Sequence, residues 1–267
     1  MRTWNEPPPL APGAVHLWLA RDGEIRDAAE VQAGTQVLSE AERARAARYR
    51  CPDQAHQSRL AHGLKRHVLS LYRPEVAPDR WRFDAGSHGK PRLAGSGVPL
   101  AFNLSHARGL IALAVARSET LAAPDLLGVD VEATGRRTSL DIAKRFFAPG
   151  EVRDLAALPV GLHRARFFAL WTLKESYIKA RGLGLAIPLD GFAFSFPGTD
   201  GIGFRPDADA AVPAGSWRFA QATVGSGHAL AVGCAAPVPP RLAVFEAVPG
   251  VRFRPLDLAW SRRSHGA

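Results

Sequence analysis

Cysteine is nearly absent from the 267-residue sequence: only Cys51 and Cys234 occur, far apart and without a CxxC spacing. A disulfide framework or a structural zinc site is therefore not expected. Long hydrophobic runs are also missing, so no membrane span of about 18 apolar residues is predicted. The segment Met1–Leu10 contains Glu6 and three prolines, unlike the basic and then apolar pattern of a signal peptide. We therefore expect a cytoplasmic protein.

Lysine is scarce as well, since only five of the 34 basic residues are lysine. The formal net charge is nevertheless +9. A basic surface favours an acidic partner, which can be nucleic acid, anionic lipid, a phosphorylated ligand or an acidic protein. In a sequence that otherwise uses arginine, a lysine can be required as a compact ammonium group. We therefore treat three lysines as candidate functional residues: Lys90, Lys174 and Lys179.

The two halves of the chain follow a similar order of elements. Each half predicts an apolar strand, two or more helices, and a closing hairpin with a polar turn; the segments 105–116 and 226–236 resemble each other. We predict an α+β fold of two pseudo-symmetric lobes, each with a small, mainly antiparallel sheet packed against one long helix. The boundary falls near 118–124, giving an N-terminal lobe of residues 1–122 and a C-terminal lobe of residues 123–267 with a C-terminal extension.

The first group of candidate functional residues lies on the predicted strand Gly128–Glu132. Because side chains alternate along a strand, Asp130 and Glu132 point to the same side. Two carboxylates on one side repel each other unless a cation lies between them, and such oxygen ligands suit Mg²⁺. The alternative is an acidic strand edge in contact with solvent.

A second group lies on the predicted helix 164–181. Trp171, Glu175 and Lys179 follow at intervals of four residues and share one side of the helix. As part of a site, they would supply a third carboxylate and an ammonium group for phosphate. The alternative is a surface ion pair of little consequence.

A third group follows a strand, at Ser105 and His106, with Lys90 earlier in the chain. These side chains can donate hydrogen bonds to phosphate oxygens, although a single histidine is often structural. No GxSxG motif is present, which argues against a serine hydrolase. Together, carboxylates, basic groups and a candidate base are what phosphoryl-type transfer requires.

The three groups, in order and spacing, resemble the signatures of 4'-phosphopantetheinyl transferases of the larger, two-lobed class that activates peptide and polyketide synthetases. The resemblance spans about residues 40–196. It is carried by the segments Phe102–His106, Gly128–Glu132 and Trp171–Ala180, with support from Ala143–Phe147 and Gly89–Pro91.

The resemblance implies that a carrier-protein serine attacks the β-phosphate of coenzyme A, so that phosphopantetheine is transferred and 3',5'-ADP leaves. It implies coenzyme A as the donor, Mg²⁺ as the cofactor, and a lobe-to-lobe cleft as the binding place. It further implies that Glu175 acts as the general base and Lys179 assists at the pyrophosphate. The implied metal ligands are Asp130, Glu132 and Glu175, and the implied coenzyme A contacts are Arg45, Lys90, Ser105, His106, Lys174 and Lys179.

One position departs from the family pattern: Gln57 stands where an arginine is frequent, with Arg59 close by.

The resemblance also implies the partners of the protein. They are expected to be acidic carrier domains of fatty acid, polyketide or nonribosomal peptide synthases, without nucleic acid or membrane, and the chain is expected to be a monomer. Three alternatives stay open: a magnesium-dependent hydrolase of coenzyme A or a nucleotide, a carrier-binding module without catalysis, and a nucleic-acid-binding protein.

Overall fold

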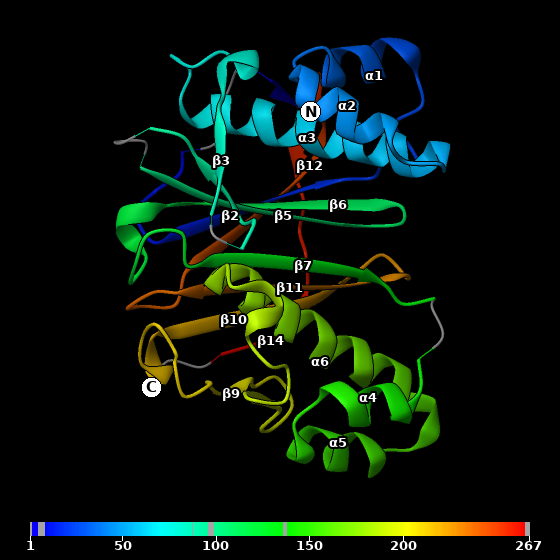
Figure 1. Ribbon diagram of the computed structural model, residues 1–267, viewed down its shortest axis with the longest axis vertical. Helices are drawn as coiled ribbons and strands as arrows, with labels where there is room; N and C mark the ends of the chain where they lie inside the picture. The colour runs from blue at the N-terminus through cyan, green and yellow to red at the C-terminus, as the bar shows by residue number, and fades with distance from the viewer. Residues whose placement is uncertain (1, 5–8, 87, 96–98, 136–137, 265–267) are drawn as a thin grey trace.

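The elements form four layers, with one group of helices on each outer side and two sheets between them (Figure 1). The computed structural model describes residues 2–4, 9–86, 88–95, 99–135 and 138–264. Helices α1, α2 and α3 cover the first sheet, and α4, α5 and α6 lie on the far side of the second sheet. The predicted α+β class, with one long helix packed on each sheet, is confirmed.

The first sheet has the strand order β1-β13-β12-β2-β6-β5. Its pairs are antiparallel except for β12 and β2, which run parallel. The strands are β1 (Arg2–Thr3), β2 (Ala14–Ala20), β5 (Leu100–Ala107), β6 (Leu110–Arg117), β12 (Arg241–Val248) and β13 (Arg252–Pro255).

The second sheet has the order β14-β10-β11-β7 and is antiparallel throughout. Two short hairpins, β3–β4 and β8–β9, complete the strands. The strands are β7 (Leu127–Ala133), β10 (Trp217–Val224), β11 (His228–Ala235), β14 (Trp260–Arg263), β3 (Phe83–Ala85), β4 (Pro91–Leu93), β8 (Ala193–Ser195) and β9 (Gly203–Arg205).

Local sequence signals explain where the helices begin and end. Ser39 and Glu42 form a reciprocal capping box at the start of α2. Pro52 occupies the first turn of α3, where its missing N–H removes no helical bond. Gly182 ends α6 in the left-handed conformation, at a φ of 67°. The helices are α1 (Ala28–Thr35), α2 (Glu40–Ala47), α3 (Pro52–Tyr72), α4 (Leu140–Phe146), α5 (Pro149–Ala156) and α6 (Val160–Arg181), with short 3-10 turns at Pro78–Arg80, Ser118–Thr120, Gly184–Ala186 and Ala214–Ser216.

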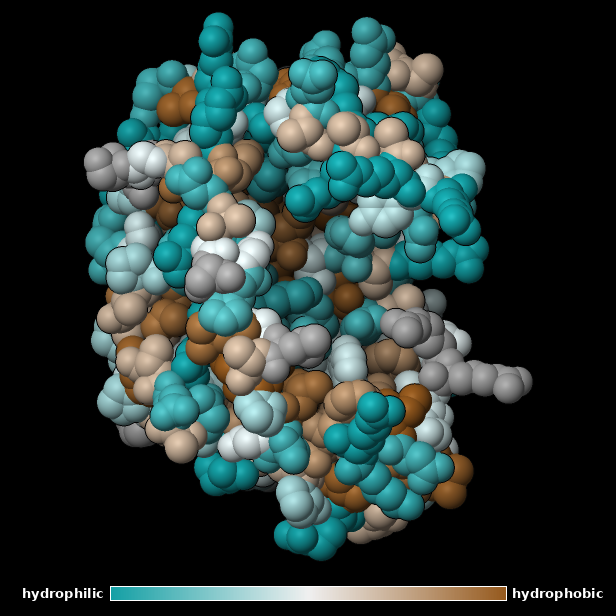
Figure 2. All heavy atoms as spheres, in the orientation of Figure 1, coloured by the Kyte–Doolittle hydropathy of each residue, from teal (hydrophilic) through white to brown (hydrophobic). Residues whose placement is uncertain are grey.

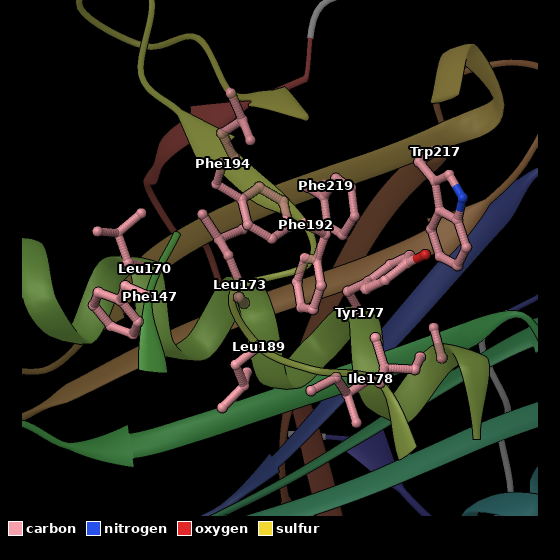
Figure 3. Packing of buried hydrophobic residues seen from close by; sticks show 14 of the residues in the cluster. Phe147, Leu170, Leu173, Tyr177, Ile178, Leu189, Phe192, Phe194, Trp217 and Phe219 are labelled. Carbon is pink, nitrogen blue, oxygen red and sulfur yellow. The ribbon is translucent and has the colours of Figure 1, made fainter. Parts of the chain in front are cut away.

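Three apolar clusters hold the layers together. One lies between the two sheets, where Leu17 and Ala114 of the first sheet belong to the same cluster as Val129 and Leu230 of the second. A second joins α3 to the outer side of the first sheet. The third joins α6 to the outer side of the second sheet, with aromatic side chains gathered around Tyr177 (Figure 3). Each cluster removes apolar surface from water, the main favourable term in folding.

The C-terminal segment does not stay with the second lobe, as the prediction for residues 123–267 assumed. Strand β12 pairs with β2 and with β13, so Arg241–Pro255 complete the first sheet. The chain then returns, and β14 pairs with β10 of the second sheet. The extension therefore ties both lobes together; the boundary near residue 122 stays a prediction. No helix in the described part of the chain is long and apolar enough to cross a membrane.

Candidate active site

The candidate active site forms where the edge strands of the two sheets, β5 and β7, lie side by side. Two β5 side chains take the place of backbone pairing: Asn103 Oδ1 accepts the Val129 N–H at 2.9 Å, and Ser105 Oγ accepts the Val131 N–H at 3.3 Å. These bonds fix the position of β7 along β5. They bring Ser105 directly against Asp130, which stands between the two bonded residues of β7.

Asp130 is buried, with 3% of its surface exposed. Its Oδ1 atom accepts hydrogen bonds from Ser105 Oγ at 3.0 Å and from Lys179 Nζ at 2.6 Å. Burial raises the pKa of this carboxyl, although Lys179 and Ser105 oppose the shift. Its Oδ2 atom is buried and has no hydrogen-bond partner among the described residues. A buried carboxylate oxygen without a partner carries a free-energy cost that a bound cation would relieve.

Close contact between β7 and α6 brings the third acid, Glu175, to the site. A Cβ atom on Gly128 would lie 2.0 Å from the Ser176 carbonyl oxygen and 2.6 Å from the Ala180 nitrogen, so only glycine permits this approach. Burial raises the pKa of Glu175; the charges of Asp130 and Glu132 add to this increase, and Lys179 opposes it. The three acids that the resemblance implies as metal ligands therefore interact electrostatically.

Lys179 connects the lobes at this point. Its ammonium donates to Ser105 Oγ at 2.8 Å as well as to Asp130, and the side chain is 29% exposed. His106, the next residue of β5, is exposed. Its imidazole is still partly desolvated, and this, together with the charge of Lys179, lowers its pKa. The charge of Lys179 therefore reaches His106 as well as Asp130.

The acids fit a divalent cation in chemical type, but not in their present arrangement. No group of three or more His, Cys, Asp or Glu side chains within the described ranges is placed so that it could hold a metal ion. Asp130 forms a salt bridge with Lys179 instead, and the ammonium offsets the charge of its carboxylate. Carboxylate oxygens, one of them buried without a partner, are nevertheless the donors that Mg²⁺ prefers. Binding would require these side chains to rotate.

Two adjoining cavities lie in the first lobe, beside the site. The smaller has a volume of about 200 Å³ and includes His106 and Asn103 in its wall. The larger, about 680 Å³, lies between α2, α3 and β3, and Figure 2 shows a hollow on this face. Both cavities are lined by Arg45, His62, Lys65 and Pro91. Arg45, which the resemblance implies as a coenzyme A contact, is exposed and lines both cavities.

Two lysines predicted to contact coenzyme A are buried elsewhere. Lys90 Nζ donates to the carbonyl oxygens of Asp125, Leu127 and Ala180, so it joins the β3–β4 hairpin to the end of α6. Lys174 is fully buried in an ion pair with Glu151 at 2.7 Å. Their ammonium groups are already satisfied by protein atoms, which argues against the expected phosphate contacts.

A buried ionic cluster in the first lobe was not predicted. Glu42 of α2 accepts hydrogen bonds from Lys65 at 3.0 Å and Arg66 at 2.7 Å, and His62 lies 3.4 Å away. Burial alone would raise the pKa of Glu42, but Lys65, Arg66 and the Ser39 N–H together lower it to about 2. Burial lowers the pKa of Lys65 to about 8. Nothing in the charged stretch of α2 distinguishes Glu42 from its solvent-exposed neighbours, apart from its capping-box position.

Gln57, the departure noted in the sequence, is also buried. Its amide donates to Asp22 Oδ1 at 3.0 Å and to the Ala107 carbonyl oxygen at 2.6 Å. It therefore links α3 to the last residue of β5 and to Asp22.

Comparison with known proteins decides the family. A sequence profile of the 4'-phosphopantetheinyl transferase superfamily matches residues 126–233. The 4'-phosphopantetheinyl transferase HetI from Nostoc sp. is 36% identical over 192 residues, which cover 69% of this chain and 76% of HetI. The chain belongs to this superfamily.

Two further relatives place this transferase in the class that includes Sfp. The 4'-phosphopantetheinyl transferase Sfp from Bacillus subtilis is 34% identical over 157 residues, covering 58% of this chain and 65% of Sfp. The enzyme psf-1 from Bacillus pumilus is 33% identical over 152 residues, covering 56% of this chain and 60% of psf-1. The chain thus spans slightly less than two thirds of the length of these Bacillus relatives. The predicted family and enzyme class are confirmed.

Proposed function

We propose that this transferase moves 4'-phosphopantetheine from coenzyme A to a serine of a carrier protein and releases 3',5'-ADP. Family membership supports the reaction class and the donor. The observation that supports this site for the reaction is the convergence of Asp130, Glu175 and Lys179 where β5, β7 and α6 meet.

Within this proposal, Glu175 is the general base. Its raised pKa lies closer to neutral pH than the pKa of a free glutamate. The carboxylate therefore accepts a proton from a serine hydroxyl more readily. Lys179 would release Asp130 and turn toward the pyrophosphate, where its charge would offset the charge that develops on the leaving group. Arg45 and His106, which line a cavity of the first lobe, would hold the phosphoadenosine end. Ser105 would instead position Asp130 and Lys179, since its buried hydroxyl is bonded to both.

Asp130, Glu132 and Glu175 would hold Mg²⁺ in this proposal. When bound, the ion would neutralise negative charge on the pyrophosphate of coenzyme A. The unpartnered Oδ2 atom of Asp130 supports the assignment. A divalent ion should raise the melting temperature of the wild type, and the Asp130→Asn variant should lose this increase.

The partner in this proposal is an acidic carrier domain of a fatty acid, polyketide or nonribosomal peptide synthase. The net charge of +9 supports an acidic partner, because opposite charges speed encounter. A monomeric state and a cytoplasmic location stay predictions.

The mass of an apo carrier protein tests the reaction. The carrier is incubated with this chain, coenzyme A and Mg²⁺, and is then weighed by mass spectrometry. A gain of one phosphopantetheine is expected. Consumption of coenzyme A without a gain on the carrier would instead indicate hydrolysis, and neither change would leave only a binding role.

A further inference from the structure

A separate cavity lies beneath the N-terminal turns of α6, at the ends of β10, β11 and β14. Its volume is about 500 Å³, within the range of ligand-binding cavities. Asp130, Glu175, Lys179 and Arg45, which form the proposed catalytic and coenzyme A site, do not line it. We call it the α6 groove. Its lining residues include Leu158, Gly161, Leu162, Arg164, Arg166 and Arg262.

The charge in the α6 groove has one sign. The ionisable side chains that line it are Arg164, Arg166 and Arg262, and no described aspartate or glutamate is among the lining residues. The first turn of α6 also has no acidic residue and no side-chain cap, so the positive end of the helix dipole adds to the same potential. The groove therefore favours an anionic ligand.

Two of these arginines are held together at one aromatic ring. The guanidinium carbons of Arg166 and Arg262 lie 4.3 and 4.8 Å from the centre of the Phe196 ring. Neither forms an ion pair with another residue that the structure describes. Burial and the positive charge of Arg262 lower the pKa of Arg166. The negative charge of Asp154 opposes this change only in part. The pair thus has only a partial balance of charge from Asp154 and no direct ion pair among the described residues.

An unsatisfied hydrogen-bond donor supports the same conclusion. Arg262 Nη1 is buried and has no hydrogen-bond partner in the described part of the chain. Buried N–H groups are normally paired, and an unpaired one on a charged group is costly. A carboxylate that accepted hydrogen bonds from both guanidinium groups would remove this cost and would also offset the repulsion between the two positive charges.

The remaining surface of the groove is apolar and identifies the kind of anion. Leu158, Leu162 and several alanines form much of its wall. On the same first turn of α6, Val160 is 82% exposed and Leu162 is 52% exposed. Apolar side chains next to arginines are typical of protein-binding surfaces. A free inorganic anion would engage the arginines but leave this apolar surface in water.

We propose that the α6 groove binds an acidic peptide segment of a protein partner, with its carboxylates on Arg166 and Arg262 and its apolar side chains on Leu158 and Leu162. The proposal is independent of catalysis, because the groove and the proposed catalytic residues are different sets.

The test uses a short fluorescein-labelled peptide of glutamate, leucine and glycine, without serine, and measures its binding by fluorescence anisotropy. The Arg166→Gln/Arg262→Gln variant should bind it about tenfold more weakly than the wild type, because two charge-assisted contacts are lost. The control variant Arg26→Gln/Arg80→Gln removes the same charge from exposed arginines, 52% and 77% exposed. It should change the affinity less than about twofold.

Peptides with glutamine for glutamate, or glycine for leucine, should both bind more weakly. Equal losses in the two double variants would show general attraction to a basic surface and overturn the proposal. Tight binding that pyrophosphate abolishes and that does not depend on leucine would reassign the groove to a small oxyanion. The melting temperature of Arg166→Gln/Arg262→Gln should change little, because the relief of like-charge repulsion opposes the loss of two contacts to Phe196. Unchanged peptide affinity would contradict the proposal whatever the melting temperature.

Discussion

Replacing Lys90 with methionine should weaken the contact between the lobes. The Lys90 ammonium donates to the carbonyl oxygens of Asp125, Leu127 and Ala180, which belong to the segment before β7, to β7 itself and to α6. Its stem also packs against Gly182, where an added Cβ would lie 2.8 Å from Lys90 Cδ. Methionine keeps most of this stem but cannot donate a hydrogen bond.

The size of the effect follows from two opposing terms. The carbonyls of Leu127 and Ala180 would lose this donor, at a cost of roughly 1–3 kcal/mol each. The Asp125 carbonyl would keep the Leu127 N–H as a donor. Burial lowers the pKa of Lys90 to about 8 from 10.5, so removing the desolvated charge returns about 3 kcal/mol. We therefore expect the free energy of unfolding to fall by about 1 kcal/mol, or the melting temperature by about 2–4 °C.

Chemical denaturation of Lys90→Met and of the control Lys144→Met measures this loss. Lys144 is an exposed lysine, with 63% of its side chain accessible and a single ion pair to Asp141. Its replacement should change stability by less than about 0.5 kcal/mol. If Lys90→Met proved as stable as the control but bound coenzyme A far more weakly, Lys90 would contact the ligand, as the sequence resemblance implied, and the structural role would be refuted.

Three further substitutions test the fold around the site. Glu42→Gln should remove a pH-dependent contribution of about 3 kcal/mol to the free energy of unfolding. Because the pKa of Glu42 is lowered to about 2, the wild type has this contribution above pH 4.5 and loses it as the pH falls toward 2. Urea unfolding at pH 6 and pH 3 should therefore show a smaller difference in stability for the variant than for the wild type. Gly128→Ala should lower stability by about 1–3 kcal/mol and also lower transfer activity, because α6 must move away from β7; full activity in a stable variant would contradict the close-packing argument. Lys174→Met should cost about 3–5 kcal/mol by leaving the buried charge of Glu151 without a counter-ion. Lys174→Met/Glu151→Gln should recover part of this loss; no recovery would mean that the ion pair is not the source of the effect.

Much of the site could be predicted from the sequence because its signals are local. Alternation along a strand places Asp130 and Glu132 on one side, and the four-residue helical spacing places Glu175 and Lys179 on one side of α6. Their meeting across the lobes could not be derived this way and was expected only through family resemblance. This meeting depends on Asn103, which accepts a hydrogen bond from β7 that no local sequence pattern predicts.

What the sequence did not predict depends on contacts between distant residues. Parallel pairing of β12 with β2 joins residues 227 positions apart, since Arg241 pairs with Ala14, and neither strand contains information about the other's position. The burial of Lys90 and Lys174 reverses the usual exposure of lysine. Their rarity in the sequence correctly drew attention to them, but residue type alone could not distinguish a phosphate contact from a buried structural ammonium.

Carrier-protein mass in the presence of Glu175→Gln tests the central claim most directly, namely that the acids joined at β7 and α6 perform the transfer. The variant is compared with the wild type and with Glu24→Gln, a substitution at a glutamate that is 76% exposed. We predict a phosphopantetheine gain with the wild type and Glu24→Gln, and a rate reduced by about 100-fold or more with folded Glu175→Gln. Transfer at the wild-type rate by Glu175→Gln would contradict the account.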